Sequence, residues 1–266
     1  MTLAPAEVKS CCATAYSSAA ARWLLGDSFH PGGKELTSRM GQDLQVGPGK
    51  LVVDVASGPG TSALQVAHDT GCDVIGVDLA TESVAAATVA ASEAGLSERV
   101  RFVQGDAEAL PLAEESADGA LCECALCTFP DKAMAACELA RVLRPGARVA
   151  ISDITALKDK LPPQLTSLQA WVACIADARP LDEIASLLEE GGLVVETTER
   201  HDEALGAMLD QIDARLQAAR LLGPGLLGDR VGQGRELVAA AQDAVARNVL
   251  GYGVVVARCP GASGPA

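Results

Sequence analysis

Aromatic residues are scarce in this 266-residue chain, which has two tryptophans, two tyrosines and three phenylalanines. A site that grips a flat molecule by stacking is therefore not suggested. Basic residues are also few, since 21 lysines and arginines stand against 35 acidic residues, a formal charge of −14. Such a surface repels phosphate backbones, and no local basic patch interrupts it, so we expect no nucleic-acid partner.

Long apolar runs are also missing, because no stretch reaches the roughly 18 consecutive apolar residues of a membrane helix. The first residues, MTLAPAEVK, lack the charged and apolar regions of a signal peptide. We therefore expect a cytoplasmic protein without membrane contact, whose nine cysteines stay reduced. Each cysteine is then a thiol available for chemistry rather than half of a disulfide.

The most informative segment is LVVDVASGPG, residues 51–60, an apolar run that breaks into a glycine turn. A second apolar run, VIGVD, ends on an acid at Asp78. This order indicates the first β-α-β unit of a nucleotide-type α/β sheet, in which ligands bind beyond the carboxyl ends of the strands. Gly58 and Gly60 let the backbone approach a ligand closely. Asp78 is placed to accept hydrogen bonds from ribose hydroxyls.

Two enzyme classes that use such a unit are candidates for this chain. A nicotinamide dehydrogenase would carry G-x-G-x-x-G, and the third glycine position here holds Ala63, a permitted variant, so hydride chemistry stays open on this fingerprint alone. The Gly58-Pro-Gly60 pair resembles motif I of the class I S-adenosylmethionine (SAM) methyltransferases more closely. Three later segments are similar to that family, in order and at ordinary spacing: VRFVQGD (100–106), ADGALCEC (117–124) and RVLRPGARVAISD (141–153).

The resemblance covers residues 46–155 and implies an α/β fold with a Rossmann-like class I methyltransferase sheet, mostly parallel with an antiparallel last strand. It implies that SAM is the cofactor and that Asp106 lies against the adenine amine. One departure is Ala56, where many members carry the first of three glycines. The cofactor-binding residues that the resemblance implies are Asp54, Ala56, Gly58, Gly60, Asp78, Leu79, Asp106, Ala107 and Glu123.

Four regions are expected along the chain. They are an N-terminal helical arm (1–45), the SAM-binding core (46–155), cap helices with the last strands of the sheet (156–258) and a flexible tail (259–266). The periodicity predicts helices near 5–25, 34–44, 181–190, 201–222 and 233–248, and late strands at 193–199 and 253–257. A helix after Pro130 is predicted to bury a face of Ala133, Met134, Cys137 and Ala140.

Three cysteines gather in CECALCTFPDK, residues 122–132, at the end of the fourth strand. Adenine and amide N-methylases typically show Asp/Asn-Pro-Pro-Tyr there, so adenine methylation is not indicated. One interpretation is packing, with Cys122 and Cys124 on one face of the strand as small buried residues. A structural zinc is a second interpretation. However, Cys-x-Cys-x-x-Cys is not the usual paired spacing, and no histidine lies nearby to complete a tetrahedron.

A third interpretation comes from a closer resemblance. Cys124 with the following Pro130-Asp-Lys132, and Cys174 within WVAC, look like the two segments in which arsenite SAM methyltransferases carry arsenic-binding cysteines. As(III) prefers thiolate ligands, which would aim its lone pair at the methyl carbon without any general base. The family's N-terminal arsenic cysteine has no clear equivalent, since Asp27 occupies that loop. Cys11 or Cys12 remains a candidate third ligand.

Three functions are therefore open. The preferred one is SAM-dependent methyl transfer to trivalent arsenic or a similar soft element held by Cys124 and Cys174, with cellular thiols as partners. The runner-up is a small-molecule C- or O-methyltransferase, of quinone or natural-product type, with structural cysteines. The third is a non-catalytic metal or metalloid binder. Among other polar residues, His30 could line the amino-acid end of the cofactor, and Glu123 could lie near the sulfonium.

Overall fold

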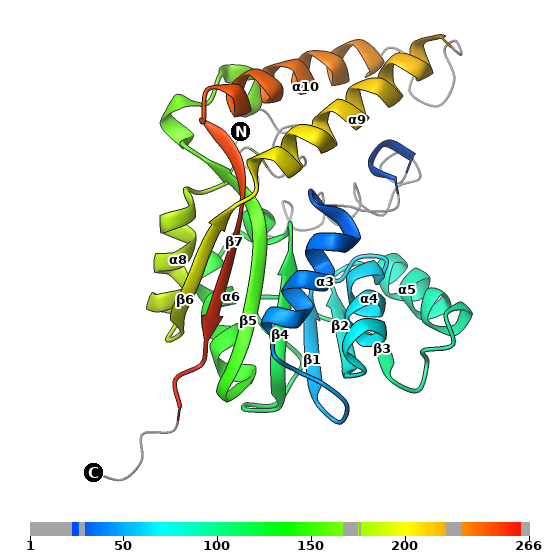
Figure 1. Cartoon of the computed structure of the whole chain (residues 1–266), viewed down its shortest axis with the longest axis vertical. Coiled ribbons are helices and arrows are strands. Elements are labelled where there is room, and N and C mark those ends of the chain that lie inside the picture. Colours follow the sequence, from blue (N-terminus) through cyan, green and yellow to red (C-terminus); the bar gives the residue numbers. More distant parts are fainter. Residues whose placement is uncertain (1–22, 27–29, 167–174, 176, 222–229, 262–266) are drawn as a thin grey trace.

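The computed structural model describes residues 23–26, 30–166, 175, 177–221 and 230–261. Within them a seven-stranded sheet has the order β3-β2-β1-β4-β5-β7-β6. Its strands are β1 (Leu51–Val55), β2 (Asp73–Asp78), β3 (Val100–Gln104), β4 (Ala117–Glu123), β5 (Leu143–Ala156), β6 (Val194–Arg200) and β7 (Leu250–Arg258). Strands β1 to β5 pair in parallel, whereas β7 runs antiparallel to both β5 and β6. The predicted mostly parallel sheet with an antiparallel last strand is confirmed (Figure 1).

Helices cover both faces of this sheet. The described α-helices are α3 (Gly33–Asp43), α4 (Thr61–Thr70), α5 (Thr81–Glu93), α6 (Lys132–Val142), α8 (Leu181–Glu190), α9 (Asp202–Leu221) and α10 (Arg230–Ala246). Three short 3₁₀ turns accompany them, η1 (Leu126–Thr128), η2 (Lys158–Lys160) and η3 (Pro163–Thr166). One apolar core joins the sheet to α3, α4, α5, α9 and α10, and a second core joins its other face to α6 and α8.

Strand β1 shows why the sequence folds this way. Successive side chains of a strand point to opposite faces of the sheet. Val52 accordingly packs into the core beneath α3 and α4, while Val53 and Val55 pack into the core beneath α6. A strand buried on both faces reads as a continuous apolar run, as residues 51–55 do.

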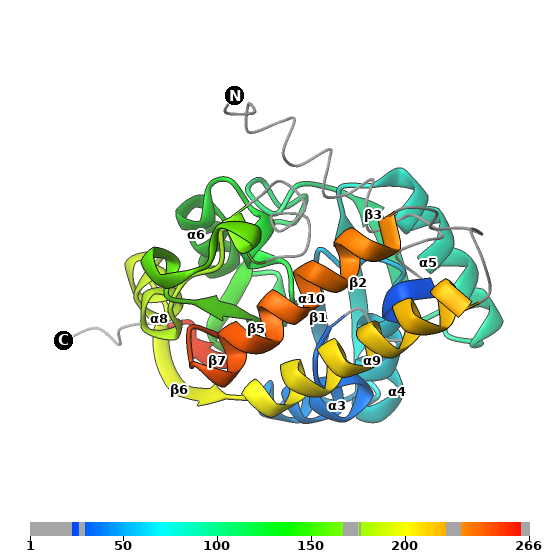
Figure 2. The same cartoon turned by 90° about the horizontal axis from the view of Figure 1, so that it is seen from above.

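The late helices cross the ends of the strands. Figures 1 and 2 show α9 and α10 side by side above the sheet, at the end where β5 finishes. Leu205, Leu209 and Leu216 of α9 are buried in the core, as the predicted amphipathic pattern requires. The helix predicted over 5–25 lies almost wholly outside the described residues, and Trp23 at its end is 40% exposed.

The predicted buried face of α6 is wrong. Met134 is 47% exposed and Cys137 is also exposed, whereas Ala135, Leu139 and Val142 are buried. The predicted face and the observed buried face of α6 are related by a rotation about the helix axis. The buried face carries Leu139 and Val142, and the exposed face carries Met134 and Cys137, so the apolar pattern alone allows both rotations.

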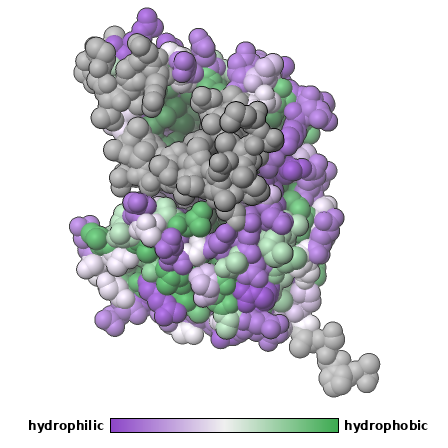
Figure 3. All heavy atoms as spheres, turned by 180° about the vertical axis from the view of Figure 1, so that it is seen from behind, coloured by the Kyte–Doolittle hydropathy of each residue, from purple (hydrophilic) through white to green (hydrophobic). Residues whose placement is uncertain are grey.

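No described helix is both long enough and apolar enough to cross a membrane. Seen from behind, the coloured part of the surface mixes hydrophobic and hydrophilic residues over short distances (Figure 3).

Candidate active site

The turn after β1 gives the site its floor. Ala56, Gly58 and Gly60 have φ angles of 58°, 52° and 83°, in the left-handed region that favours glycine. A Cβ on Gly60 would lie 2.5 Å from Cζ of Phe102, so this position needs glycine for packing. At Gly58 a Cβ would meet nothing within 4 Å, because that side of the residue faces open space. The backbone at Gly58 is therefore exposed to an incoming ligand.

Asp78, at the end of β2, is fixed beside this turn. Its carboxylate accepts hydrogen bonds from the backbone N–H groups of Gly58 (2.8 Å) and Ala80 (2.9 Å). Burial raises the pKa of Asp78, and these two hydrogen bonds oppose the rise. The Asp78 carboxylate is thus held beside the turn, where its remaining lone pairs can accept hydrogen bonds from the two hydroxyls of a diol.

Two further carboxylates are buried at the ends of β1 and β4. Asp54 is 2% exposed, and its Oδ2 has no hydrogen-bond partner among the described residues. Burial, and then the charges of Glu123 and Asp78, raise the pKa of Asp54 well above its ordinary value. An unpartnered carboxylate oxygen beside a second carboxylate fits a ligand that brings positive charge. SAM carries an ammonium and a sulfonium, so these residues fit it.

These groups surround one cleft of about 1150 Å³, open solvent at its mouth included. Eight of the nine expected cofactor residues line it, and so does Cys124; Gly60 lies behind it, against Phe102. Asp106 and Ala107 come shortly after β3, Glu123 is the last residue of β4, and Cys124 follows it directly. One continuous space therefore joins the predicted adenine end to the cysteine segment.

Cys124 lies at the point where β4 stops. It has a φ of 52°, and its N–H donates to the carbonyl of Ser152 on β5 (2.7 Å). This left-handed residue breaks the alternation of the strand. Cys122 is therefore buried in the core beneath α6, whereas Cys124 packs partly against the other core and lines the cleft. The interpretation that placed both cysteines on one face is wrong.

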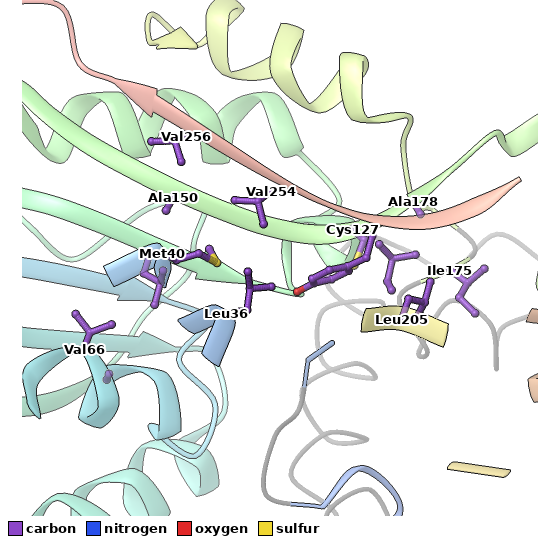
Figure 4. Packing of buried hydrophobic residues seen from close by; sticks show 14 of the residues in the cluster. Leu36, Met40, Val66, Cys127, Ala150, Ile175, Ala178, Leu205, Val254 and Val256 are labelled. Atoms are coloured by element: carbon purple, nitrogen blue, oxygen red, sulfur yellow. The ribbon is translucent and has the colours of Figure 1, made fainter. Parts of the chain in front are cut away.

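The other described cysteines are away from the cleft. Cys127 is 4% exposed and belongs to the apolar cluster in Figure 4, together with Ile175, Ala178 and Leu205. Its N–H donates to the Asp153 carboxylate (2.7 Å). Burial raises the pKa of the Cys122 thiol well above its usual range. Within the described ranges no three metal-ligating side chains gather, which gives a zinc site no support there.

Several expected site residues lie outside the described part of the chain. These are Cys11, Cys12 and Cys174, and Asp27, which stands where the family's N-terminal cysteine is expected, lies outside it too. Their relation to the cleft is a prediction from the sequence.

Two residues from the first part of the chain reach the cleft. His30 lines it, as considered from the sequence. Thr37 was not singled out, although its hydroxyl lies 3.1 Å from Glu123 Oε1 and 3.2 Å from His30 Nε2. A threonine inside a helix, 86 positions before its partner, gives no local signal. Thr128 and Phe129 were also missed as lining residues, although they directly follow the cysteine segment.

Comparison with known proteins agrees with this geometry. Residues 53–151 match the family described as "Methyltransferase domain". Over 170 residues the chain is 32% identical to "Methyltransferase GfsG" of Streptomyces halstedii, covering 63% of this chain and 61% of that one. It is 34% identical over 149 residues to "Arsenite methyltransferase" of Halobacterium salinarum, covering 54% and 37%. It is 29% identical over 170 residues to "O-methyltransferase resE" of Aspergillus sclerotiorum, covering 64% of each. The matched part spans less than two thirds of each of these relatives.

Solved structures share the fold at lower identity. The "[4+2]-Cyclase SpnF" superposes with a TM-score of 0.78 at 21% identity, covering 94% of this chain and 96% of that one. A geranyl diphosphate C-methyltransferase from Streptomyces coelicolor, solved with S-adenosyl-L-homocysteine, gives 0.75 at 15% identity, covering 97% and 100%. The first of these is described as a cyclase, so the fold alone does not fix the reaction. Residues 53–151 therefore match a methyltransferase domain, in a chain that has the class I methyltransferase fold.

Proposed function

We propose that this protein transfers the methyl group of SAM to a small-molecule acceptor bound beside Glu123 and Cys124. The observation that carries the proposal is the single cleft that runs from Asp106 to the end of β4. Bound SAM supplies a methyl group on a sulfonium, which an aligned nucleophile can displace. The chain then has to bind the cofactor, align the acceptor and keep water out.

Each of these tasks has candidate residues. Asp78 accepts hydrogen bonds from the ribose, held in place by the N–H groups of Gly58 and Ala80. Asp54 and Glu123 place negative charge near the cationic end of the cofactor. Phe129 supplies an apolar wall at the acceptor end and limits the access of water.

A small organic acceptor is favoured on three grounds. The cleft is concave and lined by both apolar and polar residues, as small-molecule sites are. The formal charge of −14 disfavours nucleic acid. A relative that is 29% identical, with the alignment covering 64% of each chain, is named an O-methyltransferase.

Trivalent arsenic is the second candidate acceptor. Cys124 lines the cleft directly after β4, and a 34% identical relative is named an arsenite methyltransferase. This candidate needs at least one more thiolate, which Cys174, Cys11 or Cys12 would have to supply. Cys122 and Cys127 are less suited, because both are buried in the cores.

The test begins with SAM binding measured by calorimetry. Wild type is expected to bind, and Asp78→Ala to bind about 10- to 100-fold more weakly, because charge-assisted hydrogen bonds are lost. Methyl-labelled SAM is then supplied with phenols, arsenite or Hg(II) in separate reactions under a thiol reductant. Label transferred to a phenol supports the organic acceptor, and label transferred to arsenite supports the second candidate.

The cysteine variants separate the two acceptors. Cys124→Ser and Cys174→Ser should abolish transfer to arsenite, while Cys137→Ser, which removes an exposed thiol on α6, should leave it unchanged. Transfer to an organic acceptor should survive all three substitutions. A protein that binds SAM or soft metals tightly and transfers no methyl group would contradict the proposal and support the non-catalytic binder.

A further inference from the structure

A buried polar cluster joins the N-terminal region to the end of β4. It consists of His30, Thr37 and Glu123, whose side chains are 8%, 2% and 4% exposed, respectively. The Thr37 hydroxyl lies 3.2 Å from His30 Nε2 and within hydrogen-bond distance of both Glu123 oxygens. His30 Nε2 itself lies 3.6 Å from Glu123 Oε2. His30 and Glu123 line the cleft, and Thr37 connects them from behind.

The contact with Pro31 favours one tautomer of the His30 imidazole. Nδ1 lies 3.2 Å from the carbonyl oxygen of Pro31. A carbonyl only accepts, so this contact is a hydrogen bond when Nδ1 carries the hydrogen. In the neutral ring Nε2 then holds a lone pair, and this nitrogen is the one that neighbours Thr37 and Glu123.

The Thr37 hydroxyl has one hydrogen, for which His30 Nε2, Glu123 and the Gly33 carbonyl (3.3 Å) are alternative acceptors. When His30 is neutral, the hydroxyl can donate to Nε2. When Nε2 gains a proton, the hydroxyl can turn to Glu123 and its oxygen can accept from Nε2–H. The second arrangement pairs all three side chains, and in it the carboxylate neutralises the imidazolium from 3.6 Å. Uptake of one proton on Nε2 therefore frees the Thr37 hydroxyl to donate to Glu123.

We propose that the His30–Thr37–Glu123 cluster accepts the proton of a protic acceptor, a hydroxyl compound, during methyl transfer. This inference rests on the proposed function and narrows its substrate class. A bond forms between the acceptor oxygen and the methyl carbon, and the carbon–sulfur bond breaks with its electron pair staying on sulfur. The hydroxyl proton leaves through the Glu123 carboxylate, which lines the cleft, and ends on His30 Nε2, so the positive charge of the sulfonium ends on the imidazolium. A proton-accepting group of this kind contributes about 10²- to 10⁴-fold to the rate.

The experiment compares two acceptors at neutral pH with methyl-labelled SAM. The first is phenol, which keeps its proton there, and the second is pentafluorophenol, which has already lost it. His30→Gln should slow transfer to phenol by about 10²-fold or more and transfer to pentafluorophenol by less than about 10-fold, since only the first needs a proton acceptor. His68→Gln, at an exposed histidine of α4, is the matched control and should change neither rate.

The role of Thr37 is positioning, and a pair of variants tests it. Thr37→Ser keeps the hydroxyl and should keep most of the phenol rate, whereas Thr37→Val keeps the shape and should lose it. The SAM dissociation constant should stay within about threefold in all variants, because a loss of cofactor binding would slow both acceptors alike. A second, substrate-independent measurement is the tautomer of His30 in wild type by nitrogen NMR, which is practical because the chain has three histidines.

Three results would overturn the inference: equal losses with both phenols, a neutral His30 ring protonated on Nε2, or a wild type that binds SAM and methylates neither phenol. Transfer to arsenite in that last case would leave methyl transfer standing and refute only the protic acceptor. A wild type that does not bind SAM would refute the proposed function itself.

Discussion

The two glycines of the motif I turn should fail in different ways when each is replaced by alanine. Gly60 has a φ of 83°, and a Cβ there would lie 2.5 Å from Phe102 Cζ and 2.9 Å from Ala87 Cβ. The left-handed backbone costs about 1–2 kcal/mol for alanine, and overpacking adds about 1–3 kcal/mol. Gly60→Ala should therefore lose about 2–5 kcal/mol of unfolding free energy.

Gly58 has a φ of 52°, but a Cβ there would meet nothing within 4 Å. Gly58→Ala should cost only the backbone contribution of about 1–2 kcal/mol. Because Gly58 lines the cleft, the added methyl group would project toward the space that the cofactor needs. Its main effect should be on SAM affinity, with a loss of about tenfold or more, equivalent to about 1.4 kcal/mol.

Urea unfolding followed by circular dichroism gives the stability of both variants, and calorimetry with SAM gives their affinity. The reasoning would be refuted if Gly60→Ala were as stable as wild type, or if Gly58→Ala were the less stable of the two. Unchanged SAM affinity in Gly58→Ala would show that the cofactor does not approach this backbone.

Three more substitutions follow from the same contacts. Lys132→Met should destabilise the protein by about 3 kcal/mol in urea unfolding, because the 6%-exposed ammonium bonds Asp177 and two carbonyls. Asp54→Asn should stabilise the ligand-free protein at neutral pH and weaken SAM binding. Burial, followed by the charge of Glu123, raises the pKa of Asp54, so the ionised carboxylate opposes folding. The stability that Asp54→Asn gains over wild type should vanish below about pH 3.8, the ordinary pKa of the aspartate. It should be complete once the pH exceeds the pKa of Asp54 in the folded protein. Ala56→Gly should raise the urea midpoint, since Ala56 holds a φ of 58°.

The sequence was sufficient to predict the cofactor half of the cleft. Residues 51–60 and Asp78 are neighbours through one β-α-β unit, whose geometry is local and repeats across α/β proteins. The same unit explains Ala56. The resemblance places a glycine at this position, and Ala56 holds a φ of 58°, in the left-handed region that glycine adopts more readily.

The acceptor half depends on contacts that no local pattern encodes. Thr37 and Glu123 meet although 86 positions separate them, and a mid-helix threonine has the same spacing signature whether it faces solvent or a carboxylate. The face of Cys124 was mistaken because one left-handed residue ended the alternation of β4. The face of α6 was mistaken because Ala133 and Cys137 are apolar but small, so the pattern offered two rotations.

Unfavourable local features gather around the cleft, which is itself an argument for its role. Ala56 and Cys124 both hold left-handed backbone, and both line the cleft. Asp54 Oδ2 and Ser57 Oγ are buried there without a hydrogen-bond partner among the described residues. Strain and unpaired polar groups of this kind persist at sites where a ligand compensates for them. SAM binding should therefore stabilise the fold by the amount that its concentration and affinity set, and the partners it supplies to Asp54 and Ser57 contribute to that affinity.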